Sequence, residues 1–266
     1  MDKKINIFAN KAETTIKIKK QIIPILERYG YVCSETYDDT ALFNLIIGGD
    51  GTFINACHAS GFSDIPFVGI NTGHLGFYQE VQPDELEMMA KKLVEGNYTV
   101  QEIKLIDCLV VTDSAEYNYL CVNELVLKAK YTSIIHFNMY VNNILLQKFA
   151  GDGVIFSTPS GSTAYSLSAG GAILYQDLKG FQITPMAPIR SSLHRSLDKS
   201  LIVPEHTNIK LITSRREESF FALGIDGILQ EFEDINNITV SLADKSIKKL
   251  VFDQNWYWKN IKDKLI

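Results

Sequence analysis

An aspartate stands between glycines directly after an apolar run in NLIIGGDGTFI, residues 44–54. A buried strand that ends in glycines places the next backbone at the carboxyl edge of a parallel sheet, where open α/β proteins bind ligands. Gly48, Gly49 and Gly51 leave room for a phosphate to approach main-chain N–H groups, and a helix beginning after Thr52 would add its positive end. The stretch is therefore predicted to bind phosphate.

Asp50 would repel a phosphate unless it has a chemical task that offsets the repulsion. Two such tasks are binding Mg²⁺ and accepting the proton of an attacking hydroxyl. The alternative is that Asp50 caps the following helix or makes an Asx turn. The full GGDGT motif after an apolar run favours the functional interpretation. A Walker A loop and a G-x-G-x-x-G dinucleotide fingerprint are both absent, which disfavours a Rossmann dehydrogenase.

A second glycine-rich segment, GDGVIFSTPSGSTAYSLSAGG, covers residues 151–171 and contains Asp152. Its hydroxyls and N–H groups are suited to phosphate, ribose or adenine edges, and residues 162–165 are predicted to cap and begin a helix. A surface loop that caps a helix is the alternative. The concentration of glycine and hydroxyl residues beside an acid favours ligand binding.

Three further motifs carry polar or aromatic groups. Asn123 and Glu124 interrupt an apolar segment and suit the vicinal hydroxyls of a ribose, although a bulge or strand edge explains them about as well. Phe77, in the glycine loop TGHLGF, is either a stacking platform for a base or nicotinamide or a core aromatic, and His74 is predicted to be structural. Asp226-Gly227 is predicted to be a hairpin turn.

The elements that must position these motifs change character near residue 100. Before it, short apolar runs alternate with helical patterns, which predicts a parallel sheet covered on both faces. After it, β-rich segments are joined by Asn, Asp, Gly and Ser turns. The expected strands are 5–8, 31–33, 45–47, 67–70, 100–106, 108–112, 119–127, 134–141, 209–213 and 238–242, and the expected helices are 13–29, 53–59 and 83–95.

We therefore expect an α/β N-terminal domain with a Rossmann-like parallel sheet (1–100), a mainly β, β-sandwich-like domain (101–250), and a C-terminal segment (251–266) that packs back on the first domain. The aromatics Trp256, Tyr257 and Trp258 in that last segment would be costly to leave exposed.

Composition excludes several classes of function. The chain has 266 residues, 21% of them charged, with a formal net charge of −5, so no broad basic face is expected for nucleic acid or acidic membranes. The four cysteines lack metal-ligand spacing, so no metal ligands are assigned. The first residues are too polar for a signal peptide, and no apolar run is long enough to span a membrane. A cytoplasmic protein is predicted.

Taken together, the motifs resemble the bacterial NAD kinase family. The matching blocks, in the family's order, are GGDGT at 48–52, NTGHLGF at 71–77, NE at 123–124, DG at 152–153, STPSGSTAYSLSAGG at 157–171 and DG at 226–227. GGDGT alone is shared with diacylglycerol-type lipid kinases and, loosely, with phosphofructokinases. The long block is far more specific.

The resemblance implies transfer of the γ-phosphate of ATP to the 2′-hydroxyl of the adenosine ribose of NAD, giving NADP, with Mg²⁺ or a similar divalent ion. It makes Asp50 the proton acceptor. The NAD-binding residues that it implies are Asp50, Gly51, Phe77, Asn123, Glu124, Asp152, Ser160, Thr163, Ala164, Tyr165, Ser168 and Ala187. The phosphate loop for ATP is Gly48, Gly49, Gly51 and Thr52.

The resemblance also implies a homodimer or homotetramer in which a neighbouring subunit completes the site, with residues 187–194 contributing across the interface. Some relatives carry an arginine where this chain has Ala150, and Lys148 is the candidate substitute. A lysine ammonium is a point charge and lacks the bidentate geometry of an arginine guanidinium. The segment around Arg190 and His194 is longer than its counterpart in many relatives.

Two rival functions remain open on the sequence. A lipid kinase of the GGDGT superfamily would associate with membranes and leaves STPSGSTAYSLSAGG unexplained. A non-catalytic NAD(P)-binding sensor would keep the pocket but would not need Asp50.

Overall fold

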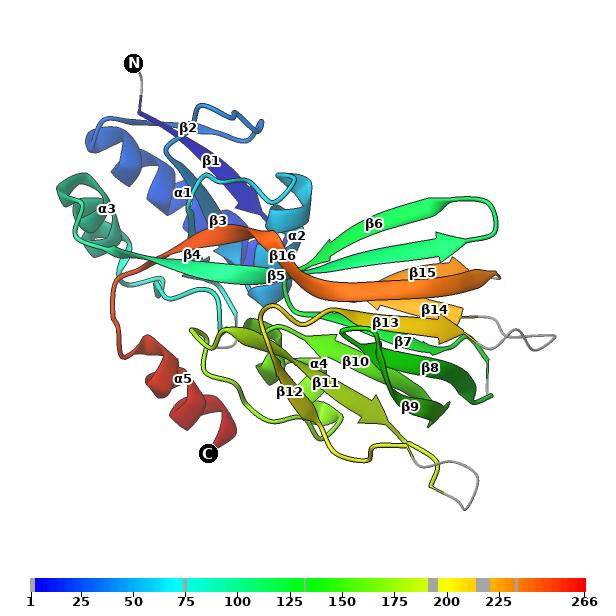
Figure 1. Cartoon of the computed structure of the whole chain (residues 1–266). Helices are drawn as coiled ribbons and strands as arrows, with labels where there is room; N and C mark the ends of the chain where they lie inside the picture. The colour runs from blue at the N-terminus through cyan, green and yellow to red at the C-terminus, as the bar shows by residue number, and fades with distance from the viewer. Residues whose placement is uncertain (1–2, 74–75, 132, 191–195, 214–220, 233) are drawn as a thin grey trace. The chain divides into compact units, whose positions relative to one another are not determined.

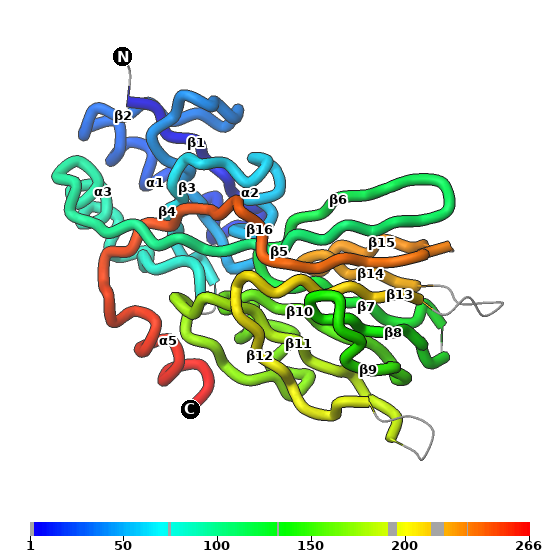
Figure 2. The backbone as a smooth tube through the Cα atoms, in the orientation of Figure 1, coloured from blue at the N-terminus to red at the C-terminus, as the bar shows by residue number. Residues whose placement is uncertain are grey.

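The computed structural model describes residues 3–73, 76–131, 133–190, 196–213, 221–232 and 234–266. The chain divides into two compact units, drawn in Figure 1: unit 1 is Met1–Ile103 with Ser246–Ile266, and unit 2 is Lys104–Lys245. Two long strands, β5 (Thr99–Thr112) and β16 (Ile235–Val251), supply residues to both units and can be followed in Figure 2.

Unit 1 is an α/β unit built on a parallel sheet. Its strands lie in the order β2-β1-β3-β4-β16, and each neighbouring pair is parallel. The elements are β1 (Lys3–Ala9), α1 (Glu13–Arg28), β2 (Tyr31–Ser34), β3 (Phe43–Gly48), α2 (Asp50–Ala59), β4 (Phe67–Asn71), α3 (Leu86–Glu95) and α5 (Trp256–Leu265), with the start of β5 and the end of β16.

The core of unit 1 explains why its central strands are continuously apolar. Every residue of β3 and of β4 is buried, as expected for strands covered on both faces. On one face, Ile22 of α1 and Met89 of α3 pack in a cluster with Leu45 and Ile70. The expectation of a parallel sheet covered on both faces is confirmed.

Strand pairing brings the two glycine loops of unit 1 to one edge of the sheet. Gly48 and Asn71, the last residues of β3 and β4, lie opposite each other in the ladder. The Thr72 N–H donates to the Gly48 carbonyl at 3.3 Å. The loops that follow the two strands therefore begin side by side.

Helix α2 begins earlier than the sequence pattern indicates. It starts at Asp50, not near Phe53, because the N–H groups of Thr52 and Phe53 already donate to the Gly49 carbonyl. The last three residues of GGDGT thus form the first turn of the helix. Apolar periodicity misses this turn because it contains no core side chain before Phe53.

Unit 2 is mainly β. One sheet has the order β12-β11-β10-β7-β14-β15, and β16, β13, β8 and β9 are neighbours in the other. The elements are β6 (Glu116–Cys121), β7 (Glu124–Ala129), β8 (Ile135–Val141), β9 (Ile144–Gly151), β10 (Gly153–Ser157), η1 (Ser160–Thr163), α4 (Tyr165–Ser168), β11 (Gly180–Met186), β12 (Leu201–Pro204), β13 (Ile209–Thr213), β14 (Phe221–Ile225) and β15 (Ile228–Phe232), with most of β5 and β16.

One hydrophobic cluster is shared by the two sheets of unit 2. Phe156 of β10 and Leu223 of β14 come from one sheet, whereas Phe137 of β8 and Leu211 of β13 come from the other. Alternating inward-facing residues from two sheets that share one core make a β-sandwich. The predicted fold class, α/β followed by mainly β, is confirmed.

Three local expectations are wrong. The segments 100–106 and 108–112, expected as separate strands, form one continuous strand, β5. The single strand predicted over 119–127 is two strands, β6 and β7, which belong to different sheets because the chain crosses over at Val122 and Asn123. Trp258 was expected to be covered, but it is 59% exposed, whereas Tyr257 of the same helix is 8% exposed. The helical repeat turns only one side of α5 toward the body of unit 1.

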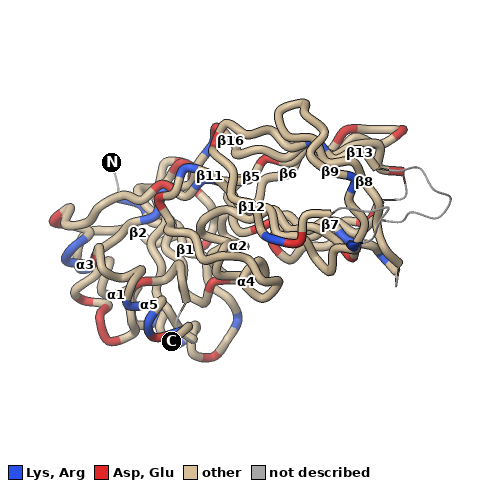
Figure 3. Tube along the Cα trace, turned by 60° about the horizontal axis from the view of Figure 1, so that its bottom comes forward, with Lys and Arg blue, Asp and Glu red and all other residues tan. Residues whose placement is uncertain are grey.

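The surface and the cysteines match the composition. Lys and Arg (blue) and Asp and Glu (red) are both scattered along the described chain in Figure 3. All four cysteines are free thiols. Within the described ranges, none of the helices is both long enough and apolar enough for a membrane span.

Candidate functional site

The Asp50 carboxylate joins the two glycine loops of unit 1. Its Oδ2 accepts the Phe77 N–H at 2.9 Å, and its Oδ1 accepts the Tyr78 N–H at 3.1 Å. Although Asp50 is the first residue of α2, the hydrogen bonds of its carboxylate among the described residues come from Phe77 and Tyr78 and not from that helix. The capping alternative is therefore wrong, and the carboxylate, one third exposed, lies between the loops.

The approach of the two loops depends on a glycine. A Cβ on Gly76 would lie 2.4 Å from Asp50 Oδ1 and 2.5 Å from Gln79 Oε1. The Gln79 amide in turn donates to the Gly49 carbonyl at 2.7 Å. Gly48 is equally confined, since its Cβ would lie 2.2 Å from Thr52 Oγ1.

Helix α5 lies against these loops. The Asn260 amide, fully buried, donates to the Gly76 carbonyl at 3.0 Å. Lys264 Nζ lies 3.9 Å from Asp50 Oδ2 and 4.2 Å from the centroid of the Phe77 ring. Phe77 is only 8% exposed, so it is a mostly buried aromatic with a cation over its ring. Neither Asn260 nor Lys264 belongs to a recognisable motif, and no signal in the sequence marks them.

In unit 2, the Asp226 carboxylate organises the Asn123-Glu124 pair. Its oxygens accept the N–H groups of Val122 at 2.8 Å, Asn123 at 2.7 Å and Glu124 at 3.2 Å. Asp226 and Gly227 both have positive φ, 48° and 83°, and join β14 to β15 in a two-residue hairpin turn. The predicted hairpin is confirmed, but the sequence does not reveal that its acid also holds the chain at 122–124.

Glu124 is a buried acid with one oxygen left over. Its side chain is 8% exposed, and Oε2 has no hydrogen-bond partner among the described residues. Burial, and then the negative charge of Asp226, raise the pKa of Glu124 to about 7, while a hydrogen bond from the Tyr165 N–H opposes the rise. A buried oxygen without a protein partner suits a ligand hydroxyl.

The hydroxyl-rich segment divides into structural and accessible groups. Thr158 Oγ1 donates to the Val122 carbonyl at 2.7 Å, and Ser166 Oγ lies 3.0 Å from Thr184 Oγ1, both inside the unit. A Cβ on Gly161 would lie 2.0 Å from the Asn123 carbonyl oxygen, so only glycine fits there. Of the predicted NAD-binding residues in this segment, Ser160 is buried, Thr163 and Ala164 are half-buried, and Tyr165 and Ser168 are exposed.

Asp152 and Ala187 lie at the far end of the same sheet. In the β10 ladder, Ser157 pairs with Glu124 and Gly153 pairs with Met186, so the two groups are separated by the length of β10, roughly 13 Å. The Asp152 N–H donates to the Met186 carbonyl at 3.0 Å, beside Ala187. The structure of unit 2 thus does not bring Asp152 and Ala187 together with Asn123 and Glu124.

The remaining candidates take different places. Ala150 is fully buried, Lys148 is exposed on β9, and Arg190 forms an exposed ion pair with Asp198 at 2.6 Å. His74 and His194 lie outside the described residues.

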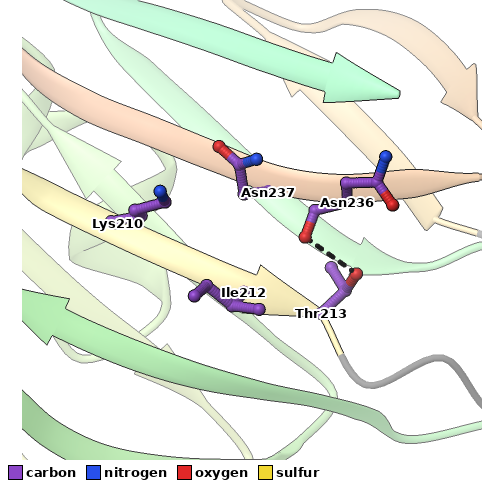
Figure 4. A pocket seen from close by; sticks show the side chains of 5 residues that line it. All are labelled: Lys210, Ile212, Thr213, Asn236 and Asn237. Atoms are coloured by element: carbon purple, nitrogen blue, oxygen red, sulfur yellow. Dashed lines mark hydrogen bonds between the residues drawn. The ribbon is translucent and has the colours of Figure 1, made fainter. Parts of the chain in front are cut away.

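A surface hollow of about 350 Å³ in unit 2 contains none of the predicted residues. It is lined by Lys210, Ile212, Thr213, Asn236 and Asn237 of β13 and β16, shown in Figure 4. The Thr213 hydroxyl donates to carbonyl groups of β16. Its lining contains one lysine, Lys210, and no carboxylate, imidazole or thiol.

We predict that Gly76→Ala lowers the free energy of unfolding by about 1–3 kcal/mol, because the new methyl group must push the loop away from Asp50. Gly73→Ala is the matched control in the same loop, since its Cβ meets nothing within 4 Å. Urea denaturation of both variants measures the difference. Equal free energies of unfolding for the two variants would show that the loop accommodates the added methyl group without loss of stability.

We predict a pH-dependent effect of Glu124→Gln on stability. Between pH 4.5 and 7 the folded chain holds a proton on Glu124 that the unfolded chain releases, so this group's contribution to stability falls as the pH rises through that window. The advantage of the Gln variant should therefore grow from pH 5 to pH 8, by up to about 3 kcal/mol. Urea denaturation at several pH values measures it, with the exposed Glu116→Gln as control. A difference independent of pH would contradict the raised pKa.

Two family models match the chain, and their junction falls within the β-rich part of the sequence. The ATP-NAD kinase N-terminal domain matches residues 5–98, and the ATP-NAD kinase C-terminal domain matches residues 122–250. The first match contains Asp50 and the glycine loops. The second contains Asn123, Glu124, the hydroxyl-rich segment and Asp226.

Whole-chain relatives agree with these models. The chain is 42% identical to an NAD kinase of Finegoldia magna, over 98% of this chain and 97% of that protein, and 30% identical to one of Lactobacillus acidophilus, over 99% and 97%. Among solved structures, yeast NADH kinase complexed with NADH is similar with a TM-score of 0.88 and 19% identity, over 99% of this chain and 87% of that one.

An NAD kinase from Archaeoglobus fulgidus in complex with ATP has a TM-score of 0.77 and 22% identity, and the match covers 97% of each chain. At such identities the two solved structures support the fold. The 42% identity over nearly the whole length, together with the two family models, shows the family. This chain, whose Asp50 carboxylate holds two glycine loops together, therefore belongs to the NAD kinase family of phosphotransferases.

Proposed function

We propose that this protein transfers the γ-phosphate of ATP to the 2′-hydroxyl of the adenosine ribose of NAD, with Asp50 as the proton acceptor. The observation that carries the assignment of Asp50 is its placement. The carboxylate lies beside a glycine loop at the carboxyl edge of a parallel sheet, and its oxygens accept hydrogen bonds from Phe77 and Tyr78.

The proposed reaction uses Asp50 as a general base. As the 2′-oxygen forms its bond to the γ-phosphorus, its proton passes to the Asp50 carboxylate. The bond from the γ-phosphorus to the bridging oxygen breaks, and ADP leaves with the electron pair. The hydrogen bonds from Phe77 and Tyr78 orient the carboxylate before the substrate arrives.

The phosphate loop binds through its backbone. Gly48 and Gly49 lead into α2, and Gly51 and Thr52 belong to its first turn, where the positive end of the helix favours the ATP phosphates. Gly51 has open space where a Cβ would stand, which suits close approach of a dinucleotide.

In the proposal, NAD is held by unit 2. The unpartnered Oε2 of Glu124 accepts a hydroxyl of a ribose, and the Asn123 amide serves a neighbouring polar group. The accessible residues Thr163, Ala164, Tyr165 and Ser168 line the adenosine side, while buried Ser160 supports the turn.

A divalent metal fits this site only together with substrate phosphates. The described residues contain no group of three or more His, Cys, Asp or Glu side chains that could hold a metal. Mg²⁺ keeps several waters and is bound through one or two carboxylates and substrate phosphates, so Asp50 with ATP is a sufficient donor set. When bound, the ion would neutralise charge on the transferred phosphate.

We also propose that the protein is a homodimer or homotetramer. Asp152 and Ala187 lie a strand's length from Glu124 in unit 2, so they would serve the site of a neighbouring subunit. A cytoplasmic location is part of the proposal, because all four cysteines are free thiols, which suits a reducing compartment. No role for nucleic acid or membrane enters the proposal.

The two rival functions are not favoured. A lipid kinase would share GGDGT but not the C-terminal family model that matches residues 122–250. A sensor would bind NAD without the need for a carboxylate held between the two loops.

We expect Asp50→Asn to reduce turnover by at least roughly 10²-fold while NAD binding stays close to that of the unchanged protein, because a general base is lost and a near-isosteric side chain remains. The assay combines the protein with Mg²⁺-ATP and NAD, and reads NADP through a dehydrogenase that accepts only NADP. Calorimetry with NAD measures binding.

The control is Asp64→Asn, which removes an exposed acid in the same unit. Near-normal turnover of Asp50→Asn would overturn its role as the base. No NADP from the unchanged protein, with NAD still bound, would overturn the kinase proposal in favour of the sensor.

We expect Asp50→Asn and Asp152→Ala chains to restore each other's activity when they are co-expressed with different tags and purified as mixed oligomers. In each pair formed by one chain of either kind, one site combines the unchanged Asp50 of one chain with the unchanged Asp152 of the other. The measurement is NADP formation relative to each variant alone. Activity no greater than the sum of the two would show that both residues act within one chain.

A further inference from the structure

We propose that Lys264 of helix α5 is a further catalytic residue, whose ammonium group binds the γ-phosphoryl group during its transfer. The inference rests on the proposed function and adds to it a residue outside every motif of the family resemblance. It is carried by the position of the ammonium group beside the Asp50 carboxylate and by the spare hydrogen-bond donors of that group.

Among the described residues, the N–H donors of the Lys264 ammonium group have no hydrogen-bond acceptor. Nζ is 3.9 Å from Asp50 Oδ2, beyond hydrogen-bond distance, and 4.2 Å from the centroid of the Phe77 ring. No residue in the described part of the chain accepts a hydrogen bond from Nζ. A lysine ammonium has three N–H donors, so an incoming phosphate oxygen can accept a hydrogen bond from Nζ without displacing a protein acceptor.

Partial burial strengthens the interaction between this ammonium group and a bound anion. The Lys264 side chain is 21% exposed. Burial lowers its pKa, and the charge of Asp50 opposes that shift. An ammonium group that has lost part of its water and lacks a close protein acceptor gains more from a phosphate than an exposed lysine does.

The phosphate loop lacks a cation of its own. Residues 48–52 and the described residues 71–73 and 76–78 contain no lysine or arginine. Phosphoryl transfer depends on positive charge around the transferred group, which a lysine supplies in other nucleotide-binding loops. Lys249 also interacts electrostatically with Asp50, but its side chain is buried, at 2% exposed, and its stronger charge interaction is with Glu80. Of these two lysines, Lys264 is the one that reaches the surface.

The fold holds Lys264 in this place through Asn260. The two residues are four apart on α5 and so share one face of the helix. Asn260 is fixed by its buried hydrogen bond to Gly76, directly before Phe77 and Tyr78, whose N–H groups hold Asp50. The base, its supporting loop and the ammonium group are therefore parts of one packed arrangement.

The step assigned to Lys264 involves no covalent change in the lysine. As the 2′-oxygen bonds to the γ-phosphorus and the bond to the bridging oxygen of ADP breaks, negative charge rests on the three equatorial oxygens. The ammonium group stabilises that charge by hydrogen bonding. The 2′-hydroxyl proton still passes to Asp50, and the electron pair still leaves with ADP.

The test compares Lys264→Met, Lys264→Arg and the control Lys262→Met. Met keeps the helix propensity and much of the apolar stem. Lys262 is exposed on the same turn of α5, so its variant makes the same change of charge away from Asp50. We expect Lys264→Met to lose roughly 10²-fold in kcat with little change in KM for NAD, because the lost contact stabilises the transition state. Arg should restore part of the loss, and Lys262→Met should stay within about twofold.

A binding measurement checks the phosphate contact without turnover. The ligands for calorimetry are the β,γ-imido analogue of ATP and ADP. Lys264→Met should weaken binding of the analogue more than binding of ADP, since only the analogue carries the third phosphate. Melting temperatures are recorded for every variant. Unchanged kcat in Lys264→Met would overturn the inference. So would a loss that Arg does not relieve, accompanied by a fall in melting temperature.

The two proposals fail in different ways. If the unchanged protein makes no NADP, the proposed function fails. If it makes NADP and the Lys264 variants match Lys262→Met, only the role of Lys264 fails.

Discussion

The carboxylate of Asp50 is the contact on which the candidate phosphate site depends. Parallel strands β3 and β4 end at one edge of the sheet, and beyond that edge the ladder offers no partners for the backbone. The two oxygens of Asp50 accept the N–H groups of Phe77 and Tyr78 in place of the ladder. One acid therefore shapes the loop, and the same group is available for chemistry. Gly76 must lack a side chain for this contact to form.

Two other carboxylates fasten distant segments in the same way. Asp226 accepts three backbone N–H groups at 122–124, and Glu80 accepts those of Phe252 and Asp253 where β16 leads into α5. Charge-assisted hydrogen bonds to backbone N–H groups are strong enough to offset much of the cost of burying an acid. Burial is nevertheless the largest influence on Glu80 and raises its pKa. The placement of both candidate clusters thus depends on hydrogen-bonded carboxylates, two of them partly buried and one buried, as well as on apolar packing.

The hydroxyl-rich segment shows how a functional motif can be mostly scaffold. Ser162 donates to the Pro159 carbonyl at 2.6 Å and accepts the Leu174 N–H at 2.9 Å, so its hydroxyl holds the loop together. Gln182 of β11 donates to Ser166 Oγ at 2.8 Å and accepts the Ala172 N–H at 2.8 Å. These bonds hold the turn that presents the accessible residues Thr163, Tyr165 and Ser168. Most hydroxyls of the segment thus fix the conformation of the loop, and only some of them are accessible.

The sequence by itself determined the fold class, because continuously apolar strands between helical patterns require a sheet covered on both faces, and it marked Asp50, Glu124 and the glycine loops by residue type. It did not separate β6 from β7, since the apolar residues on the two sides of Asn123 and Glu124 are equally compatible with one interrupted strand and with two strands in different sheets. The tertiary structure decided which polar groups are spent on scaffolding. It alone joined Asp226 to Asn123, 103 residues apart, and set Lys264 beside Asp50. Periodicity records which side of an element is buried, whereas hydrogen-bond partners between distant elements arise only when the chain has folded.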